Sequence, residues 1–370
     1  MSPEKHLLDW QTSQTIAESI APTLGQLYRQ KGVEVILFGK TLVNATTIDI
    51  IKAHRLSKHY TGSPLTPSQT QPIIQHLLSM RLSPCRVDVG RLAYEYWENH
   101  DDVTALDDFL QTALIESLEG EAMTKPRDVV LYGFGRIGRL LTRILVEKSG
   151  PGYPLRLRAI VVRGGKDGDL EKRASLLRRD SVHGQFNGSI VVDSERKAII
   201  VNGNFIQVIY ANKPEDVDYT AYGINNALVV DNTGVWRDAE GLGKHVACNG
   251  ASKVLLTAPG KGDIKNVVFG VNEDVIKPED TIISAASCTT NAITPVLKAV
   301  HDKFGVTSGH IETVHSFTND QNLIDNFHSG DRRGRAASLN MVLTSTGAAK
   351  AVAKAMPEMA GKLTGNAIRV

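Results

Sequence analysis

The hydrophobic positions of residues 1 to about 125 recur at helical spacing. One series starts near the N-terminus, and two more follow a break rich in Pro, Thr and Ser at residues 61–72. The three series are Leu7, Leu8, Ile16, Ile20, Leu24 and Leu27; Ile73, Ile74, Leu77 and Leu78; and Val103, Leu106, Phe109, Leu110, Leu114 and Ile115. They predict a mainly helical N-terminal extension over residues 1–125. The basic residues between positions 52 and 58, among them Lys52, His54 and Lys58, indicate a solvated helix face. Gly120 ends the helical pattern, and residues 121–127 are predicted to form a linker.

From Asp128 onward, short apolar strands alternate with helical stretches. This alternation is typical of a parallel α/β sheet. The predicted strands are 129–132, 158–162, 189–192, 198–201, 205–210, 227–230, 253–257 and 266–271. After Cys288 the pattern predicts a strand at 311–317, a loop rich in Gly and Arg near 330–335, and a helix near 347–356.

Composition excludes several classes of protein. The chain has 370 residues, 42% hydrophobic and 22% charged, with a net charge of +2, so bulk charge favours neither nucleic acid nor a membrane surface. No apolar run is long enough to cross a bilayer, and no signal pattern opens the chain. Its three cysteines are few and widely spaced, which predicts neither disulfides nor a metal site and favours the cytoplasm.

A glycine-rich motif follows the first predicted strand of the α/β region and precedes a helix. In that context the first glycine permits a tight turn, the second lets the backbone approach a pyrophosphate, and the third allows close packing of helix on strand. The alternative is a glycine turn that packs on itself. The motif predicts a Rossmann dinucleotide-binding domain over residues 126–286, with cofactor contacts at Gly133, Phe134, Gly135, Arg136, Ile137 and Gly138.

In such domains, the residue at the end of the second strand contacts the ribose of the cofactor and distinguishes NAD from NADP. A carboxylate there accepts a hydrogen bond from the 2′-hydroxyl of NAD, whereas this chain has Arg163 and Lys166 before its first acid, Asp167. Cationic side chains at this point accommodate the 2′-phosphate of NADP. They could equally be loop charges, so the sequence predicts NAD or NADP.

Cys288 lies between a short strand, residues 281–283, and a helical pattern. A thiol near a helix N-terminus is close to unpaired N–H groups and the positive end of the dipole, which favour the thiolate. Thr289 and Thr290 read as caps of that helix. The alternative is a buried cysteine that acts as a small hydrophobe. His315, on the next predicted strand, would form an ion pair with the thiolate and shuttle a proton.

These residues resemble one family, the phosphorylating glyceraldehyde-3-phosphate dehydrogenases, in order and spacing from about residue 127 onward. The matching segments are 132–139 (YGFGRIGR), 180–184 (DSVHG), 232–234 (NTG), 258–259 (AP), 284–291 (SAASCTTN), 313–315 (TVH), 345–350 (STGAAK) and 361–369 (GKLTGNAIR). The resemblance implies an α+β catalytic domain, here incomplete, over residues 287–370. It also implies a cytoplasmic homo-oligomer, tetrameric in full-length relatives.

The resemblance further implies a reaction and its residues. Cys288 would attack glyceraldehyde 3-phosphate, His315 would act as base, and inorganic phosphate would release 1,3-bisphosphoglycerate from a thioester. Cofactor contacts would extend to Arg163, Thr233, Gly234 and Thr257, and anion contacts to Ser287, Thr289, Thr318, Thr346, Gly347 and Arg369. The alternatives are oxidation of erythrose 4-phosphate and a non-catalytic nucleotide-binding protein.

Several positions depart from the family pattern. Tyr132 stands where an asparagine is usual, Asp320 where a second phosphate-contacting threonine is usual, and Asn322 where a lysine is common. The loop at residues 331–335 resembles the family's S-shaped loop. Family members also continue beyond the position of Val370, so the sequence predicts a fragment with exposed apolar faces, poor solubility and little turnover.

Overall fold

The computed structural model describes residues 2–118, 125–150, 152–344 and 346–370. Two compact units make up the chain: Met1–Arg127 with Ile144–Arg156, and Asp128–Arg143 with Leu157–Val370. Gly120 and most of the predicted linker fall in residues 119–124, outside the described residues. The predicted class, an α/β protein preceded by a mainly helical segment, is confirmed.

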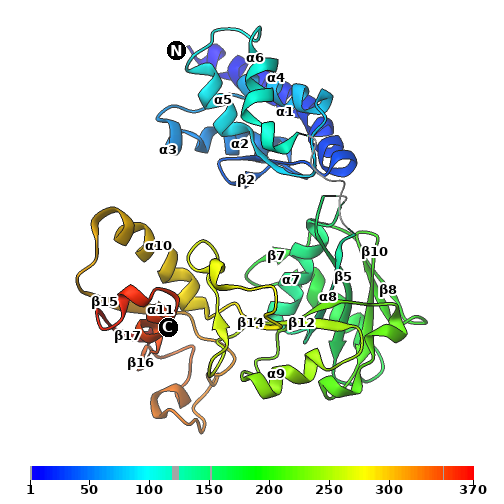
Figure 1. The fold of residues 1–370 in the computed structure, drawn as a ribbon, viewed down its shortest axis with the longest axis vertical. Helices are drawn as coiled ribbons and strands as arrows, with labels where there is room; N and C mark the ends of the chain where they lie inside the picture. Colours follow the sequence, from blue (N-terminus) through cyan, green and yellow to red (C-terminus); the bar gives the residue numbers. More distant parts are fainter. Residues whose placement is uncertain (1, 119–124, 151, 345) are drawn as a thin grey trace. The chain divides into compact units, whose positions relative to one another are not determined.

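The N-terminal unit is built mostly from helices (Figure 1). Its elements are α1 (Pro3–Lys31), β1 (Glu34–Leu37), β2 (Lys40–Thr41), α2 (Thr47–Leu56), α3 (Lys58–Thr61), α4 (Pro67–Ser79), β3 (Arg86–Asp88), α5 (Val89–Trp97), α6 (Leu106–Ala113) and a 3-10 turn at Ile115–Ser117. A three-stranded sheet of order β2-β1-β3 was not predicted. Its strands have two to four residues, too few for an alternating pattern to show.

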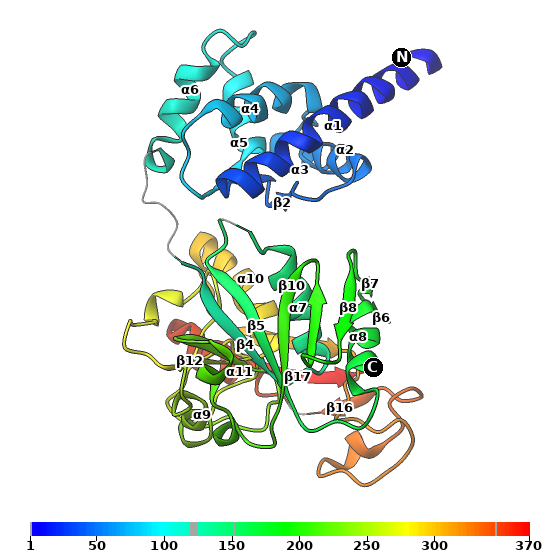
Figure 2. The ribbon, with the colours of Figure 1, turned by 90° about the vertical axis from the view of Figure 1, so that its right-hand side faces the viewer.

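Helix α1 packs through only part of its length. Ser2 caps its start, and Gly32, at φ 71°, ends it in the left-handed conformation. Ile20, Leu24 and Leu27 are buried, whereas the predicted core position Leu8 is 61% exposed. Figure 2 shows the N-terminal half of the helix extending past its neighbours α2 and α4.

His54 does not belong to a solvated face, as the sequence had suggested. It is buried, with Nδ1 2.8 Å from the carbonyl of Ile50 and Nε2 2.8 Å from the hydroxyl of Thr70. Burial lowers the pKa of His54. This histidine ties α2 to α4 as a neutral core residue.

A nine-stranded sheet, counted over the described residues, dominates the second unit, with the order β13-β14-β12-β11-β4-β5-β10-β9-β8. Figure 2 shows the part of this sheet that runs from β12 to β8. Its strands are β4 (Arg127–Tyr132), β5 (Leu155–Val162), β8 (Ile190–Asp193), β9 (Ala198–Val201), β10 (Asn204–Tyr210), β11 (Ala227–Asp231), β12 (Ala251–Leu256), β13 (Lys265–Asn266) and β14 (Ile282–Ser284). Strands β4, β11, β12 and β14 are parallel, while β9 and β8 continue antiparallel beyond β10.

Helices and turns join these strands. They are α7 (Arg136–Glu147), α8 (Asp169–Arg178), the strand pair β6 (Arg179–Asp180) and β7 (Gly184–Gln185), 3-10 turns at Pro214–Asp216, Tyr219–Tyr222 and Glu273–Val275, and α9 (Ala239–Val246). Strand β4 is buried from Asp128 to Tyr132, as expected for a parallel strand covered on both faces. The predicted strand 266–271 is wrong beyond Asn266, because Gly270, at φ 78°, turns the chain.

The remaining elements form a smaller α+β arrangement. They are α10 (Cys288–Phe304), β15 (Gly309–His315), a 3-10 turn at Asp331–Gly334, β16 (Val342–Thr344), α11 (Ala348–Ala355), a 3-10 turn at Pro357–Met359 and β17 (Leu363–Arg369). The sheet has the order β15-β17-β16. Strands β15 and β17 are parallel and in a register that pairs His315 with Arg369.

Candidate active site

The glycine turn between β4 and α7 has the geometry that the motif requires. Gly133 has φ 96°, a conformation that favours glycine. A Cβ on Gly138 would lie 2.4 Å from the carbonyl oxygen of Gly133, so helix and turn touch at that point. A Cβ on Gly135 would meet nothing within 4 Å. The backbone at Gly135 is therefore open at the start of α7, where the motif predicts that a pyrophosphate approaches the helix N-terminus.

The other residues of the motif have different environments. Phe134 is buried, while Arg136 and Ile137 are exposed. The Arg136 guanidinium lies 3.2 Å from Asp180. Hydrogen bonds from the backbone of His183 and Val182, together with Arg136, lower the pKa of Asp180 to about 2. The Arg136 side chain therefore connects the glycine turn to the DSVHG segment.

The end of β5 presents the cationic residues that the sequence placed there. Arg163 and Lys166 are both exposed. Asp169, one of the first two acids after this strand in the sequence, folds back toward it: its carboxylate lies against Gly165, where a Cβ would be 2.6 Å from its Oδ2. Arg173 at 2.5 Å and Tyr210 at 3.0 Å hold this carboxylate. The ribose-reading position therefore combines a neutralised acid with two exposed cations.

Two further segments with predicted cofactor residues lie beside the glycine turn. Thr233 and Gly234 follow β11, and the Cγ2 of Thr233 lies 2.9 Å from the position of a Cβ on Gly133. Thr257 follows β12, and its hydroxyl donates to the carbonyl of Asp231 at 3.0 Å. The ends of β4, β11 and β12 thus bring three predicted segments to one edge of the sheet.

Cys288 is the first residue of α10. Ser287 is the N-cap, since its Oγ accepts from the backbone N–H of Thr290 at 3.0 Å. The prediction that Thr289 and Thr290 cap the helix is wrong, because both lie inside it. Cys288 is exposed, so it is not a buried hydrophobe either.

The backbone before Cys288 is fixed in an uncommon conformation. Ala286 is buried and has φ 58°, in the left-handed region that a residue with a Cβ rarely adopts. The hydroxyl of Ser284, fully buried, accepts from the N–H of Ala286 at 3.0 Å and donates to the carbonyl of Ala258 at 2.7 Å. Strain of this kind clusters at functional sites. Sequence patterning gave no sign that Ser284 supports the turn.

The structure brings His315 to Cys288. The Nε2 of His315 lies 3.4 Å from the Sγ of Cys288, and the hydroxyl of Thr289 lies 3.9 Å from the same sulfur. When Nδ1 donates to the carbonyl of Ser316, 2.7 Å away, Nε2 presents a lone pair to the thiol. If the thiol proton moves to Nε2, the ring becomes an imidazolium that donates to the thiolate. Either way, one proton is shared between sulfur and imidazole.

Arg369 and Thr318 lie next to this pair. The Nη1 of Arg369 is 3.0 Å from Nδ1 of His315, 3.2 Å from the carbonyl of Ser316 and 3.5 Å from the hydroxyl of Thr318. Strand register explains the position, since Arg369 is directly opposite His315. An arginine at this point provides a fork of donors for a phosphate.

Asp320, which the sequence singled out as unfavourable for an anion, is neutralised. It accepts a hydrogen bond from Thr318 and lies 3.0 Å from the guanidinium of Arg333. Burial raises the pKa of Asp320, but the Thr318 hydrogen bond and two arginine charges outweigh it and lower that pKa overall. From the sequence, Arg333 was only one of several charges in a loop. The fold places its guanidinium beside Asp320.

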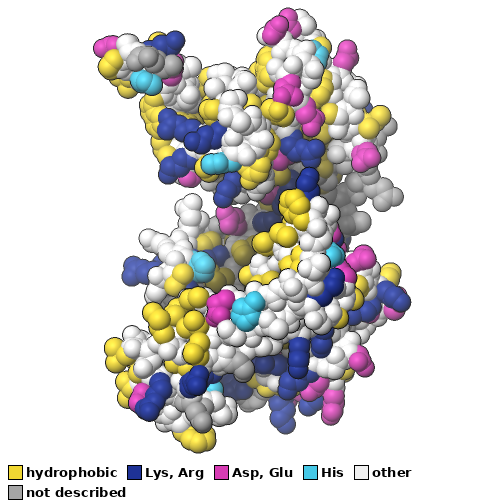
Figure 3. Space-filling model, turned by 90° about the vertical axis from the view of Figure 1, so that its left-hand side faces the viewer, with side chains coloured by type: hydrophobic (Ala, Val, Ile, Leu, Met, Phe, Trp, Pro, Cys, Tyr) yellow, Lys and Arg dark blue, Asp and Glu magenta, His cyan; other side chains and the backbone are white. Residues whose placement is uncertain are grey.

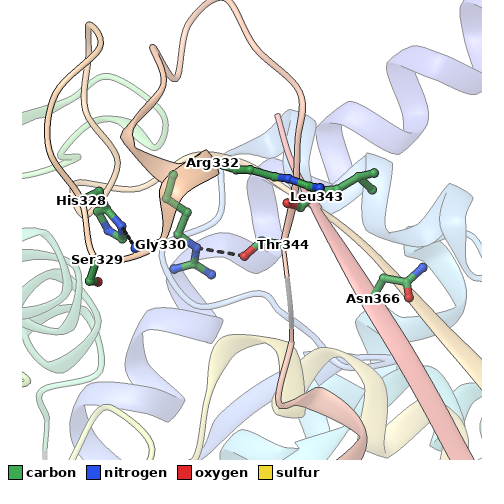
Figure 4. Close-up of a pocket in the computed structure, with 8 residues that line it drawn as sticks. His328, Ser329, Gly330, Arg332, Leu343, Thr344 and Asn366 are labelled. Carbon is green, nitrogen blue, oxygen red and sulfur yellow. Dashed lines mark hydrogen bonds between the residues drawn. The ribbon is translucent and has the colours of Figure 1, made fainter.

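A cavity of about 910 Å³ adjoins Arg333 (Figure 4). Its lining residues are His328, Ser329, Gly330, Arg332, Arg333, Leu343, Thr344 and Asn366. The guanidinium of Arg333 donates to the hydroxyl of Thr344 at 3.2 Å, which fixes it between the cavity and Asp320. The predicted S-shaped loop therefore forms one wall of a cationic hollow.

The predicted anion contacts at Thr346 and Gly347 lie at the start of α11. Gly347 is its N-cap, and the hydroxyl of Thr346 accepts from the N–H of Ala348 at 3.1 Å. A second cavity, of about 300 Å³, opens between this helix and α10 and is lined by Ser287, Thr290, Gly347 and Lys350, among others. Ser287 and Gly347 thus share one cavity, while Arg369 and Thr318 lie beside His315.

The fold and these residues define a class: an α/β protein that has the glycine turn of a dinucleotide-binding domain and an exposed cysteine paired with a histidine at the start of α10. Comparison with protein families narrows it. The family profile described as glyceraldehyde 3-phosphate dehydrogenase, NAD binding domain, matches residues 127–239, and the profile of the C-terminal domain of the same enzyme matches residues 287–370.

Curated relatives agree with these profiles. The glyceraldehyde-3-phosphate dehydrogenase-like protein of Pseudomonas aeruginosa is 56% identical over 354 residues, covering 94% of this chain and 76% of the relative. The chloroplastic glyceraldehyde-3-phosphate dehydrogenase A of Zea mays is 46% identical over 65% of this chain and 58% of its own length, and the Thermotoga maritima enzyme 46% over 61% and 64%. The chain belongs to the glyceraldehyde-3-phosphate dehydrogenase family of oxidoreductases.

The extent of these matches differs. The Pseudomonas match covers enough of the chain to include most of the N-terminal unit, whereas the chain spans less than two thirds of the maize and Thermotoga enzymes. Among the described residues, no helix is long and apolar enough to cross a membrane. Within the same residues, no three His, Cys, Asp or Glu side chains gather as metal ligands do.

Proposed function

We propose that this protein oxidises glyceraldehyde 3-phosphate in the presence of inorganic phosphate and NAD or NADP, forming 1,3-bisphosphoglycerate. The observation that carries the proposal is the 3.4 Å approach of Cys288 Sγ to His315 Nε2 at the first turn of α10. Family membership and the glycine turn support it.

Cys288 performs the covalent step. Its thiolate attacks the aldehyde carbon, a C–S bond forms as the carbonyl π bond breaks, and the resulting oxyanion takes a proton from the protonated His315 to give a thiohemiacetal. His315 takes up the proton of the thiohemiacetal hydroxyl as the carbon is oxidised, leaving a thioester on Cys288. The nicotinamide, when bound, supplies the hydride acceptor. A phosphate oxygen then attacks the thioester, the C–S bond breaks, and the acyl phosphate leaves while the thiolate is restored.

Two anions require positive or hydrogen-bonding groups. We assign one to Arg369 and Thr318 beside His315, with Arg333 and Asp320 behind them. We assign the other to the α11 N-terminus at Thr346 and Gly347, with Ser287 and Thr289 of the cysteine segment. These placements let Cys288 lie between the substrate phosphate and the attacking phosphate.

The cofactor is held by the glycine turn with Thr233, Gly234 and Thr257. The exposed Arg163 and Lys166, together with an Asp169 already bonded to Arg173 and Tyr210, support acceptance of a 2′-phosphate. We therefore propose that NADP serves as well as NAD.

Association of copies of this chain is also part of the proposal. Large apolar side chains of the second unit are exposed: Val314, Phe317, Leu323, Ile324, Phe327, Leu339, Met341 and Leu343. Figure 3 shows such side chains gathered in patches on one face. Exposed patches of this kind mark association surfaces, and we propose a homo-oligomer. Three free thiols suit a reducing compartment such as the cytoplasm.

A steady-state assay tests the reaction. We expect cofactor reduction that needs both the triose phosphate and inorganic phosphate, and a loss of at least about a thousandfold in Cys288→Ser. Faster reduction with erythrose 4-phosphate would instead favour the tetrose enzyme. NAD binding without turnover would favour a non-catalytic role.

A further inference from the structure

A buried hydrogen-bonded pair of side chains adjoins the segments assigned to the dinucleotide and takes no part in the proposed chemistry. Asp231 is the last residue of β11, His245 lies on α9, and both side chains are 0% exposed. The Nε2 of His245 is 3.0 Å from the Oδ2 of Asp231. Burying polar groups at this depth costs free energy unless hydrogen bonds compensate for it.

Asp231 fixes two of the cofactor segments at once. Its Oδ1 accepts from both the backbone N–H and the hydroxyl of Thr233, each at 2.7 Å. Its carbonyl accepts from the backbone N–H and the hydroxyl of Thr257, each at 3.0 Å. The one residue therefore sets the positions of the Thr233–Gly234 turn and of Thr257.

The Thr233 turn in turn touches the glycine turn. The Cγ2 of Thr233 lies 2.9 Å from the position a Cβ on Gly133 would take, and the amide of Asn232 donates to the carbonyl of Gly133 at 3.4 Å. A displacement of Asp231 would therefore move the surface that faces the dinucleotide.

Aromatic rings hold His245 in place. The ring of Tyr132 lies 4.6 Å from it and that of Trp236 5.5 Å from it, both edge to face. Among the described residues, Nδ1 of His245 has no hydrogen-bond partner, so the carboxylate of Asp231 is the polar contact that orients the ring. A neutral ring with a proton on Nε2 satisfies this arrangement, since a second buried N–H would lack an acceptor.

Stability alone does not explain the pair. Replacing both partners of a buried hydrogen bond by apolar groups of the same shape can be nearly neutral for stability. An apolar pair could not reproduce the hydrogen bonds, which have defined directions. Here they run from His245 on α9 to the carboxylate of Asp231, and from that carboxylate to Thr233.

We propose that Asp231 and His245 are positioning residues for the dinucleotide, holding the Thr233–Gly234 turn and Thr257 in the conformation that binds NAD. The inference rests on the proposed function only in its assumption of NAD binding. Tyr132, the departure from the family pattern, belongs to the wall that keeps the imidazole aimed at the carboxylate.

The test compares His245→Leu with His245→Gln in the full chain. Leucine fills the volume without a donor, whereas the glutamine amide places an N–H near the position of Nε2. NAD affinity is measured by calorimetry, and the rate of Cys288 alkylation by iodoacetamide shows that the catalytic segment is still folded. We expect His245→Leu to weaken NAD binding about tenfold and His245→Gln to stay within about threefold of wild type, with alkylation unchanged in both.

Several outcomes would overturn the inference. These are a folded His245→Leu protein that binds NAD as tightly as wild type, and equal weakening in the Leu and Gln variants. If His245→Leu does not fold, Asp231→Asn decides: it keeps the volume and one acceptor for Thr233, and an unchanged NAD affinity would refute the role. A several-fold loss would support it.

The inference and the proposed function fail separately. NAD binding that depends on His245, without turnover, would reject the proposed reaction and keep the positioning role. Turnover with NAD binding that is indifferent to His245 would do the reverse. Wild-type protein that does not bind NAD would overturn both.

Discussion

The parallel sheet that carries the glycine turn has a buried interior, although Arg136 and Ile137 of the turn itself are exposed, whereas around Arg369 the side chains are partly or fully exposed and several bond to one another. Asp231 and His245 are wholly buried, while Thr318 and Asp320 are exposed. The first region is held by the parallel sheet and cannot shift without breaking it. The second is held by charges that solvent screens, so its geometry depends on partners such as Arg333.

The largest effect is expected in the second region, at His315, which lies beside Arg369 and Cys288. His315→Asn retains a polar side chain but removes the base that faces Cys288, so kcat should fall by about 10²–10⁴. NAD affinity should not change, because the imidazole does not belong to the residues assigned to the cofactor, which are the glycine turn with Thr233, Gly234 and Thr257. Rapid-quench or steady-state kinetics give kcat, and calorimetry gives the affinity. Retention of wild-type kcat would remove His315 from the reaction.

A matched pair of glycine variants tests the roles of Gly135 and Gly138 in the glycine turn. Gly138→Ala places a Cβ 2.4 Å from the carbonyl of Gly133 and should lower the free energy of unfolding by about 1–3 kcal/mol as well as NAD affinity. Gly135→Ala meets nothing within 4 Å, so the protein should keep its stability and lose affinity alone. Urea unfolding and calorimetry measure the two quantities. Equal stability of both variants would contradict the close packing at Gly138.

Glycine roles were predictable because each depends on the local backbone. The strand–GxGxxG–helix order alone indicated a turn at Gly133, open space at Gly135 and close packing at Gly138. Cys288 could be found in the same way, since its position relative to a strand and a helix is local. The cap of that helix could not be predicted correctly, because Ser287, Thr289 and Thr290 are all good capping residues.

Residues defined by distant partners were missed. Asp320 seemed unfavourable from sequence because its counterion, Arg333, lies 13 positions away on a loop with no periodic pattern. Asp169 and Asp231 likewise have partners on other elements, Tyr210 of β10 and His245 of α9, although Asp169 also pairs with Arg173 on its own helix. The small sheet of the N-terminal unit was missed for another reason, since its strands are too short to show a pattern.

Asp320→Thr tests how the charges around Arg369 affect substrate binding. The change restores the residue that the family pattern has there, removes one negative charge, and frees the Thr318 hydroxyl to donate to a phosphate. The KM for triose phosphate should fall by about two- to fivefold, with kcat nearly unchanged. The difference should shrink at high salt, because the side chain is exposed. A higher KM at every salt concentration would show instead that Asp320 organises Arg333 for substrate.

The pH dependence of stability tests the burial of Cys248 and Tyr219 in the core of the second unit. Burial, with the charges of Glu215 and Asp218, raises the pKa of Cys248 to about 11, and burial also raises the pKa of Tyr219. Both groups are neutral in the fold and ionise more easily when unfolded. Their contribution to stability is therefore complete below about pH 8.5, the pKa of an unfolded cysteine, and is lost as pH rises through 11.

Thermal unfolding at pH 7.5 and pH 10.5 measures this loss, which we expect to be a few degrees. Cys248→Ala removes one of the titrating groups and should make the pH dependence shallower. An equal slope in the variant would show that Cys248 is not the group responsible.

The central claim, that Cys288 carries the substrate as a thioester, has a direct measurement. The protein is incubated with glyceraldehyde 3-phosphate and NAD in phosphate-free buffer, quenched in acid, and mapped by peptide mass spectrometry. The account predicts a 3-phosphoglyceroyl adduct on Cys288 that disappears when inorganic phosphate is added before the quench. An adduct on Cys85 or Cys248, or cofactor reduction with Cys288 unmodified, would contradict it.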